Sequence, residues 1–167
     1  DVTEAQMLAG ANRALLIAAD GSAELLAFAD VTANADGSYT LSTLLRGLRG
    51  TEWASGRHAP GDLFVLVNDA LVEVLLPLAA LNTTRYARAV GRADDFDAVA
   101  AIGRTITGAA EKPYAPAAIA GARDGSGNLT ITALRRSRIG GREWVDGSEA
   151  VPQPEESEAY EVDILDG

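Results

Sequence analysis

The stretch 36–52 constrains the fold most, because it joins an alternating strand to a loop in which arginine and glycine recur at fixed offsets. Residues 39–44 alternate in the manner of a strand, with Tyr39, Leu41 and Thr43 expected on one face. The other face carries Thr40, Ser42 and Leu44. Both faces therefore mix apolar and hydroxyl side chains, and the stretch is too regular to be an arbitrary linker.

The loop after this strand predicts a structural corner. Gly47 and Gly50 are expected to break the strand, since glycines allow a positive φ that other residues disfavour. Arg46 and Arg49 stand next to them and can bond carbonyl or carboxylate groups. We therefore interpret Arg46, Gly47, Arg49 and Gly50 as a rigid corner, which need not be catalytic.

Turn signals predict further antiparallel strands up to about residue 110. The dipeptide Asp20-Gly21 separates two apolar runs in the manner of a tight hairpin. A capping-box pattern at Thr3 and Gln6 predicts a short helix before them. The expected strands are 14–19, 24–29, 63–67, 71–76, 84–90 and 99–107, with 63–67 and 71–76 forming a hairpin. These elements favour an all-β domain, barrel or sandwich-like, over residues 1–111.

A change in composition suggests a second domain over residues 112–167. The segment 111–116 contains two prolines three residues apart, which favours extended backbone and is typical of a domain junction. Beyond it, alternating or β-prone runs predict strands at 118–122, 128–135 and 159–165. The chain is thus expected to be all-β and mainly antiparallel throughout.

Several segments, in order, resemble one family. The runs "LAGANRALLI", "ELLAFADV", "YTLSTLLRGLRGTEWA" and "HAPGDLFVLV" are followed by "KPYAPAAIAGARDGSGNLTITALRRSRIGGREW" and "ESEAYEVDIL". This ordered set resembles the C-terminal region of the megatron-like tail-tip hub proteins of gene transfer agents and related tailed phages. The segment after residue 112 also resembles the start of a fibronectin type III sandwich, although Ala133 stands where that family usually has tryptophan. Leu134 or Trp144 would then fill the core, unless the register is shifted.

The resemblance implies a structural role in a virion or gene-transfer particle. The chain would be part of the hub or baseplate at the tail tip, assembled in the bacterial cytoplasm and contributing to host attachment. Its expected partners are other tail proteins and copies of itself, usually as a trimer. A hydrolase-like barrel lies upstream in longer members of this family, and nothing in this chain matches it, so we do not expect an enzyme.

Composition excludes several other classes. The net charge of −10 and the single lysine, Lys112, argue against a nucleic-acid footprint. The longest apolar run, 71–81, is interrupted by Glu73 and Pro77 and is shorter than the roughly 20 residues of a membrane-spanning helix. The start of the chain lacks the basic and apolar regions of a signal peptide. Cysteine is absent, so no disulfide or thiolate chemistry is expected.

Candidate catalytic and metal sites are few. His58 is the only histidine, and no Gly-x-Ser-x-Gly motif accompanies it, so we expect a structural or solvent-facing role. Two segments have calcium-like spacing, but turn capping by Asx side chains explains both more simply. They comprise Asp30, Asn34 and Asp36, and Asp124, Ser126 and Asn128. No phosphate-binding motif is present, so no catalytic residue, metal or cofactor is expected.

A cluster of arginines near residue 136 is a candidate interface. Arg136 and Arg138 share one face of the expected strand and could meet an acidic neighbour from another subunit or domain. The simpler alternative is an exposed face that offsets the acidic charge. A carbohydrate- or receptor-binding module on the host-facing tip is the alternative function. Sugar sites use exposed aromatic residues, and we expect several of the nine in this chain to be buried.

Overall fold

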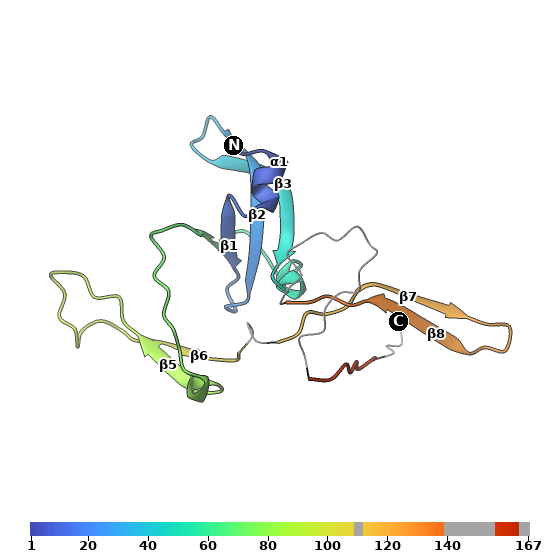
Figure 1. The fold of residues 1–167 in the computed structure, drawn as a ribbon. Coiled ribbons are helices and arrows are strands. Elements are labelled where there is room, and N and C mark those ends of the chain that lie inside the picture. Colours follow the sequence, from blue (N-terminus) through green and yellow to red (C-terminus); the bar gives the residue numbers. More distant parts are fainter. Residues whose placement is uncertain (109–111, 139–155, 164–167) are drawn as a thin grey trace. The chain divides into compact units, whose positions relative to one another are not determined.

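A computed structural model of the chain describes residues 1–108, 112–138 and 156–163 (Figure 1). These residues form three small antiparallel sheets, one short α-helix and two 3-10 turns, and they close no barrel. The all-β, mainly antiparallel prediction is therefore confirmed, in its open, sandwich-like form. No helix in the described ranges is long and apolar enough to cross a membrane.

The largest sheet has four antiparallel strands in the order β3-β2-β1-β4. They are β1 (Arg13–Ile17), β2 (Ala23–Ala33), β3 (Tyr39–Leu48) and β4 (Leu63–Leu66). The turn at Asp20-Gly21 joins β1 to β2 as predicted, because the Asp20 carboxylate accepts a hydrogen bond from the Ser22 amide at 2.8 Å.

The helix α1 (Glu4–Leu8) covers part of this sheet. Its predicted capping box is present, with the Thr3 hydroxyl accepting from the Gln6 amide at 3.2 Å and the Gln6 side chain accepting from the Thr3 amide at 2.8 Å. Met7 of α1 packs with Ala27 and Ala29 of β2. The core is small, and it consists of two clusters that lie on opposite faces of the sheet at the central strand β2.

The cluster on the face of β2 opposite α1 explains why β4 pairs with β1. Ala14, Leu26 and Phe28 form a separate buried cluster. The ring of Phe64 on β4 lies 6.4 Å from that of Phe28, so pairing β4 with β1 extends this cluster.

The predicted hairpin between 63–67 and 71–76 is therefore wrong. Its turn exists, since the Leu71 amide donates to the Asn68 carbonyl at 3.0 Å, but residues 71–76 form no strand. Pairing with β1 gives β4 a partner whose side chains already belong to the core, and a local hairpin would not. Val72 and Leu75 are left exposed.

The strand β3 also departs from expectation, because it continues through Gly47 to Leu48. The register with β2 shifts by one residue between Ala27 and Leu25, so Gly47 lies in a bulge and does not end the strand. Thr43 has a φ of 53°, and its hydroxyl donates to Asp30 at 2.6 Å. The simple alternation predicted for residues 39–44 is interrupted there.

Two hairpins and two 3-10 turns complete the described chain. The hairpins pair β5 (Thr84–Ala87) with β6 (Ile102–Thr105), and β7 (Ala117–Arg123) with β8 (Leu129–Leu134). The turns are η1 (Glu52–Ala54) and η2 (Leu78–Ala80).

The chain divides into two compact units, one formed by Asp1–Val72 with Tyr114–Gly167 and the other by Glu73–Pro113. The domain boundary near residue 112 stays a prediction. The strand expected at 159–165 is wrong over its described part, where residues 159–163 have no ladder partner. Leu134 is exposed, and Trp144 lies outside the described residues.

Candidate functional site

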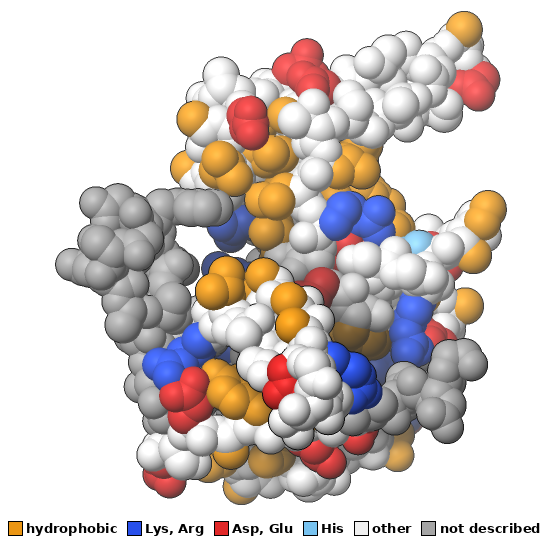
Figure 2. Space-filling view, turned by 90° about the vertical axis from the view of Figure 1, so that its right-hand side faces the viewer, with side chains coloured by type: hydrophobic (Ala, Val, Ile, Leu, Met, Phe, Trp, Pro, Cys, Tyr) orange, Lys and Arg blue, Asp and Glu red, His pale blue; other side chains and the backbone are white. Residues whose placement is uncertain are grey.

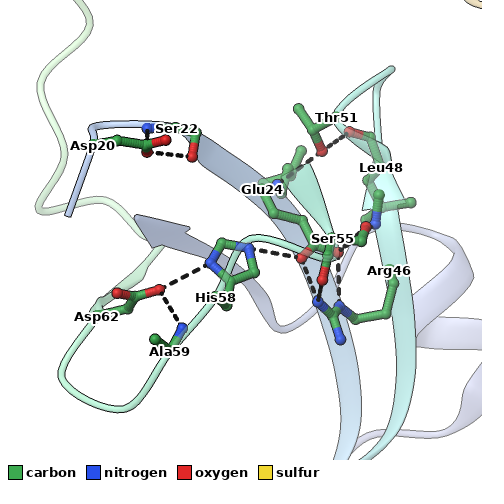
Figure 3. A network of polar contacts seen from close by, with 12 residues as sticks. Asp20, Ser22, Glu24, Arg46, Leu48, Thr51, Ser55, His58, Ala59 and Asp62 are labelled. Atoms are coloured by element: carbon green, nitrogen blue, oxygen red, sulfur yellow. Dashed lines mark hydrogen bonds and ion pairs between the residues drawn. The ribbon is translucent and has the colours of Figure 1, made fainter. Parts of the chain in front are cut away.

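The best-defined polar centre surrounds Glu24, a charged residue inside the central strand β2 (Figure 3). Its side chain is 0% exposed, and it faces the corner at the end of β3. Arg46 binds the carboxylate through two donors of its guanidinium, Nε at 2.7 Å from Oε1 and Nη2 at 2.5 Å from Oε2. This fork geometry is the strongest common form of a carboxylate ion pair.

Two further donors saturate the carboxylate. The Gly47 amide donates to Oε1 of Glu24 at 2.8 Å, and the Ser55 hydroxyl donates to the same oxygen at 2.9 Å. Arg46 also donates to the Ser55 carbonyl at 3.1 Å. One buried carboxylate therefore ties β2, the bulge of β3 and the residue after η1 together.

The pKa of Glu24 reflects these contacts. Burial raises it, but the hydrogen bonds from Arg46, the Gly47 amide and Ser55 outweigh burial and lower the pKa to about 2. The same hydrogen bond raises the pKa of Arg46. Glu24 is thus a permanently ionised anchor near neutral pH, and such a group cannot serve as a general acid.

His58 lies at the edge of this network with its side chain 11% exposed. Its Nε2 atom is 3.0 Å from Oε2 of Glu24, a close contact without hydrogen-bond geometry. Its Nδ1 atom is 3.1 Å from Asp62, whose carboxylate also accepts from the Ala59 amide at 3.0 Å. The structural role predicted for His58 agrees with this position between two carboxylates. Ser55 donates to Glu24, so the three residue types do not form a Ser-His-Asp relay.

At least one of the corner glycines was expected to have a positive φ, and both do, with 64° at Gly47 and 80° at Gly50. A Cβ atom added to Gly47 would lie 2.7 Å from the Cα of Glu52, so the site also requires a missing side chain. Arg49 has a φ of 55°, and its guanidinium makes no hydrogen bond or ion pair with the described residues. Of the two corner arginines, only Arg46 is fixed by the expected hydrogen bonds.

Thr51 closes the corner on its other side. Its hydroxyl accepts from the Leu25 amide at 2.9 Å and donates to the Leu48 carbonyl at 2.8 Å. These two bonds occupy backbone groups at the shifted register between β2 and β3. The turn η1 therefore starts from a fixed position.

The candidate interface arginines contact their own chain. Arg136 forms an ion pair with Glu52, and its guanidinium lies 5.0 Å from the ring centroid of Tyr114. Arg138 lies over the same ring at 4.3 Å. Arg136 therefore meets an acidic residue of its own chain, and an interface of Arg136 and Arg138 with another subunit stays a prediction.

The two calcium-like segments behave as capped turns. Asp36 accepts from the Ser38 amide at 2.9 Å, and Asp124 accepts from the amides of Ser126 and Asn128 at 2.8 and 2.9 Å. Within the described residues, no group of three His, Cys, Asp or Glu side chains is placed to hold a metal ion.

Sequence reasoning missed Glu24 and Ser55. A usable signal for Glu24 was present, because it is the one charged residue in the run 23–29, and a charge within an apolar strand is rarely buried without a partner. Ser55 carried no such signal, since its role depends on the path of the chain after η1.

Comparison with known proteins gives one match. Residues 1–65 match the family model described as Rcc01698-like, C-terminal. The matched part contains the whole Glu24 network and the four-stranded sheet apart from the last residue of β4. The match is consistent with a relationship to gene transfer agent proteins. No curated protein and no solved structure matches the chain.

Proposed function

We propose that this chain is a structural component of the tail tip of a phage or gene transfer agent, within the hub or baseplate. The observation that carries the proposal is the family match over residues 1–65, which coincides with the first part of the resemblance found along the sequence. In this role the chain works with other tail proteins and copies of itself, contributes to host attachment and belongs to the particle after assembly in the bacterial cytoplasm.

The chemistry of the corner supports a structural role. Glu24 is ionised and holds Arg46, the Gly47 amide and Ser55, so its oxygens are engaged with the fold. A catalytic acid or base needs a proton to give or a free position to receive one. We therefore propose a non-enzymatic function, and an assay on purified peptidoglycan tests it directly. Turnover by the chain would contradict it.

Mass spectrometry of purified particles is the decisive test of location. We expect peptides from this chain in intact particles, and antibody labelling at the tail tip in electron micrographs. Labelling of a known head protein serves as the control for particle integrity. Absence of the peptides from intact particles, or labelling confined to heads, would overturn the assignment.

A carbohydrate- or receptor-binding role is the second candidate, and one observation favours it. The expectation that several aromatic residues are buried is mostly wrong, because among those described Phe28 alone is buried. Trp53 is 58% exposed on η1, and Arg57 lies 5.5 Å from its ring. Hydrophobic side chains are likewise visible at many separate points of one face (Figure 2).

A glycan array tests this second candidate. Binding that disappears in Trp53→Ala and persists in Tyr39→Ala, another exposed aromatic residue, would support a sugar site at η1. An array without signal at high chain concentration would contradict it.

A further inference from the structure

The hairpin β5–β6 is open on both faces and both edges. Every residue of the two strands is exposed, and neither strand has a second ladder partner among the described residues. An isolated two-stranded hairpin is only marginally stable in water. A third strand would satisfy one edge and cover part of both faces.

One face of this hairpin is basic. Arg85 stands directly opposite Arg104, with Ala87 and Ile102 on the same face. Like charges at opposite positions destabilise a sheet. Neither arginine has an ion pair within the described part of the chain. An anionic strand next to them would remove this repulsion.

The other face is aromatic and hydroxylic. Tyr86 lies beside Gly103, where an added Cβ would be 3.0 Å from the ring. The hydroxyls of Thr84 and Thr105 are 3.1 Å apart on the same face. Tyr86 is nevertheless 73% exposed, so this face can accept an apolar side chain from a neighbouring strand.

The segment 159–163 has the complementary pattern. In extended backbone Glu161 and Asp163 share one face, and Tyr160 and Val162 share the other. The Tyr160 hydroxyl donates to Glu158 at 2.7 Å, a contact between alternate residues that suits an extended chain. All five residues from 159 to 163 are exposed and lack a ladder partner.

We propose that residues 159–163 of one copy of this chain add as a third strand to the β5–β6 hairpin of a second copy. Glu161 and Asp163 then lie on the arginine face, and Tyr160 and Val162 lie on the Tyr86 face. Main-chain hydrogen bonds supply the attachment, and the matching faces supply the specificity.

The charge distribution of the chain, and the presence of both segments in every copy, favour a second copy as the source of the third strand. The unit Glu73–Pro113 contains five basic and five acidic residues, so the whole net charge of −10 belongs to the rest of the chain, including residues 159–163. Each copy carries both the β5–β6 hairpin and residues 159–163. Contacts of this kind are heterologous, and they can link copies into a closed ring. The contact does not depend on the proposed location at a tail tip.

Cysteine cross-linking tests which faces meet, and the chain has no cysteine of its own to interfere. One copy carries Tyr86→Cys or Ala87→Cys, and a second copy with a different mass tag carries Val162→Cys or Asp163→Cys. We expect the pairs 86 with 162 and 87 with 163 to give at least fivefold more mixed dimer than the two crossed pairs. Equal yields in all four mixtures, or no mixed dimer, would overturn the proposal.

A charge experiment tests the partner. We expect Arg85→Glu, on the same strand as Tyr86 and Ala87, to weaken self-association at low salt at least tenfold in sedimentation experiments, and mixing it with Asp163→Arg to restore association. Arg92→Glu, the same change at another exposed arginine of this unit, should have less than a threefold effect. A chain that stays monomeric at all concentrations, or equal effects of the two glutamate variants, would refute the contact between copies.

Discussion

Glu24 is the residue on which the corner depends, because its buried carboxylate accepts hydrogen bonds from two adjacent residues of β3, Arg46 and Gly47, and from Ser55 after η1. Removing one member of a buried ion pair leaves the other without its partner, and this costs more than the pair itself contributes. Gly47 contributes to the same corner in two ways. Its amide donates to the Glu24 carboxylate, and the absence of a side chain leaves room for Glu52.

The free energy of unfolding should therefore fall at acid pH as Glu24 becomes protonated. Its pKa falls from a usual value of 4.5 to about 2 on folding, so its contribution is fully present above about pH 4.5 and is lost as the pH falls through about 2. A shift of this size corresponds to about 3 kcal/mol. Denaturant unfolding across this pH range measures the loss of stability.

Glu24→Gln should lower stability at neutral pH by about 2–4 kcal/mol and reduce the fall in stability at acid pH. Glu73→Gln, at an exposed position, is the control, and an unchanged fall in stability at acid pH in Glu24→Gln would contradict the assignment.

Gly47→Ala should destabilise the chain more than Gly37→Ala. Both glycines have positive φ, 64° and 83°, so both variants carry a backbone cost of about 1–2 kcal/mol. A Cβ at residue 37 meets nothing within 4 Å, whereas one at residue 47 meets the backbone of Glu52 at 2.7 Å. The difference in unfolding free energy should reach at least about 1 kcal/mol. Equal losses of unfolding free energy in the two variants would mean that the backbone at Glu52 shifts without cost to accommodate the added Cβ atom.

At the scale of elements, burial separates the four-stranded sheet from the two hairpins. The strand β2 has a partner on each edge and buried side chains on both faces. The strands β5, β6 and β8 are exposed along their whole length, and β7 is exposed after its first residue. Strand pairing alone does not stabilise these hairpins, because each lacks a buried face.

Amide hydrogen exchange should show this separation. We expect the amides of β1 and β2 to be the slowest in the chain, and those of β7 and β8 to exchange at least about a hundredfold faster in dilute solution. Limited proteolysis should likewise cleave the two hairpins, β5–β6 and β7–β8, before the four-stranded sheet. Equal protection of β2 and β8 in a dilute monomer would show that the hairpin has a core of its own.

At the scale of the whole molecule, the buried apolar residues are concentrated near the N-terminus. Apart from Ala80, all of those described lie between Met7 and Ala54. Cooperative unfolding requires such a shared core, and among its described residues the unit Glu73–Pro113 has one buried apolar side chain, that of Ala80. The chain should therefore have one main thermal transition, owed to the four-stranded sheet.

A chain ending at Val72 tests this expectation. It keeps the sheet and the Glu24 network, so its main transition should fall within about 5 °C of that of the full chain, corresponding to about 1 kcal/mol. Glu24→Gln in the short chain should lower the transition as it does in the full chain. Loss of all cooperative unfolding after truncation would show that residues beyond 72 stabilise the sheet.

The local features of this protein can be predicted from its sequence. The capping box at Thr3, the hairpin turn at Asp20-Gly21 and the positive φ of Gly47 and Gly50 all follow from interactions or steric limits within a few residues. The dominance of antiparallel β-structure followed from the same turns and alternating runs. Such features are readable because their causes lie in neighbouring residues.

Strand pairing and the contacts between charges depend on residues that are distant in the sequence. Residues 71–76 have the pattern of a strand, but β4 takes β1 as its partner because Phe64 reaches the core cluster there. Glu24 and Arg46 are 22 residues apart, and Ser55 joins them only after η1 turns the chain back. These choices depend on competition among distant segments for a small core, and no local pattern encodes the outcome.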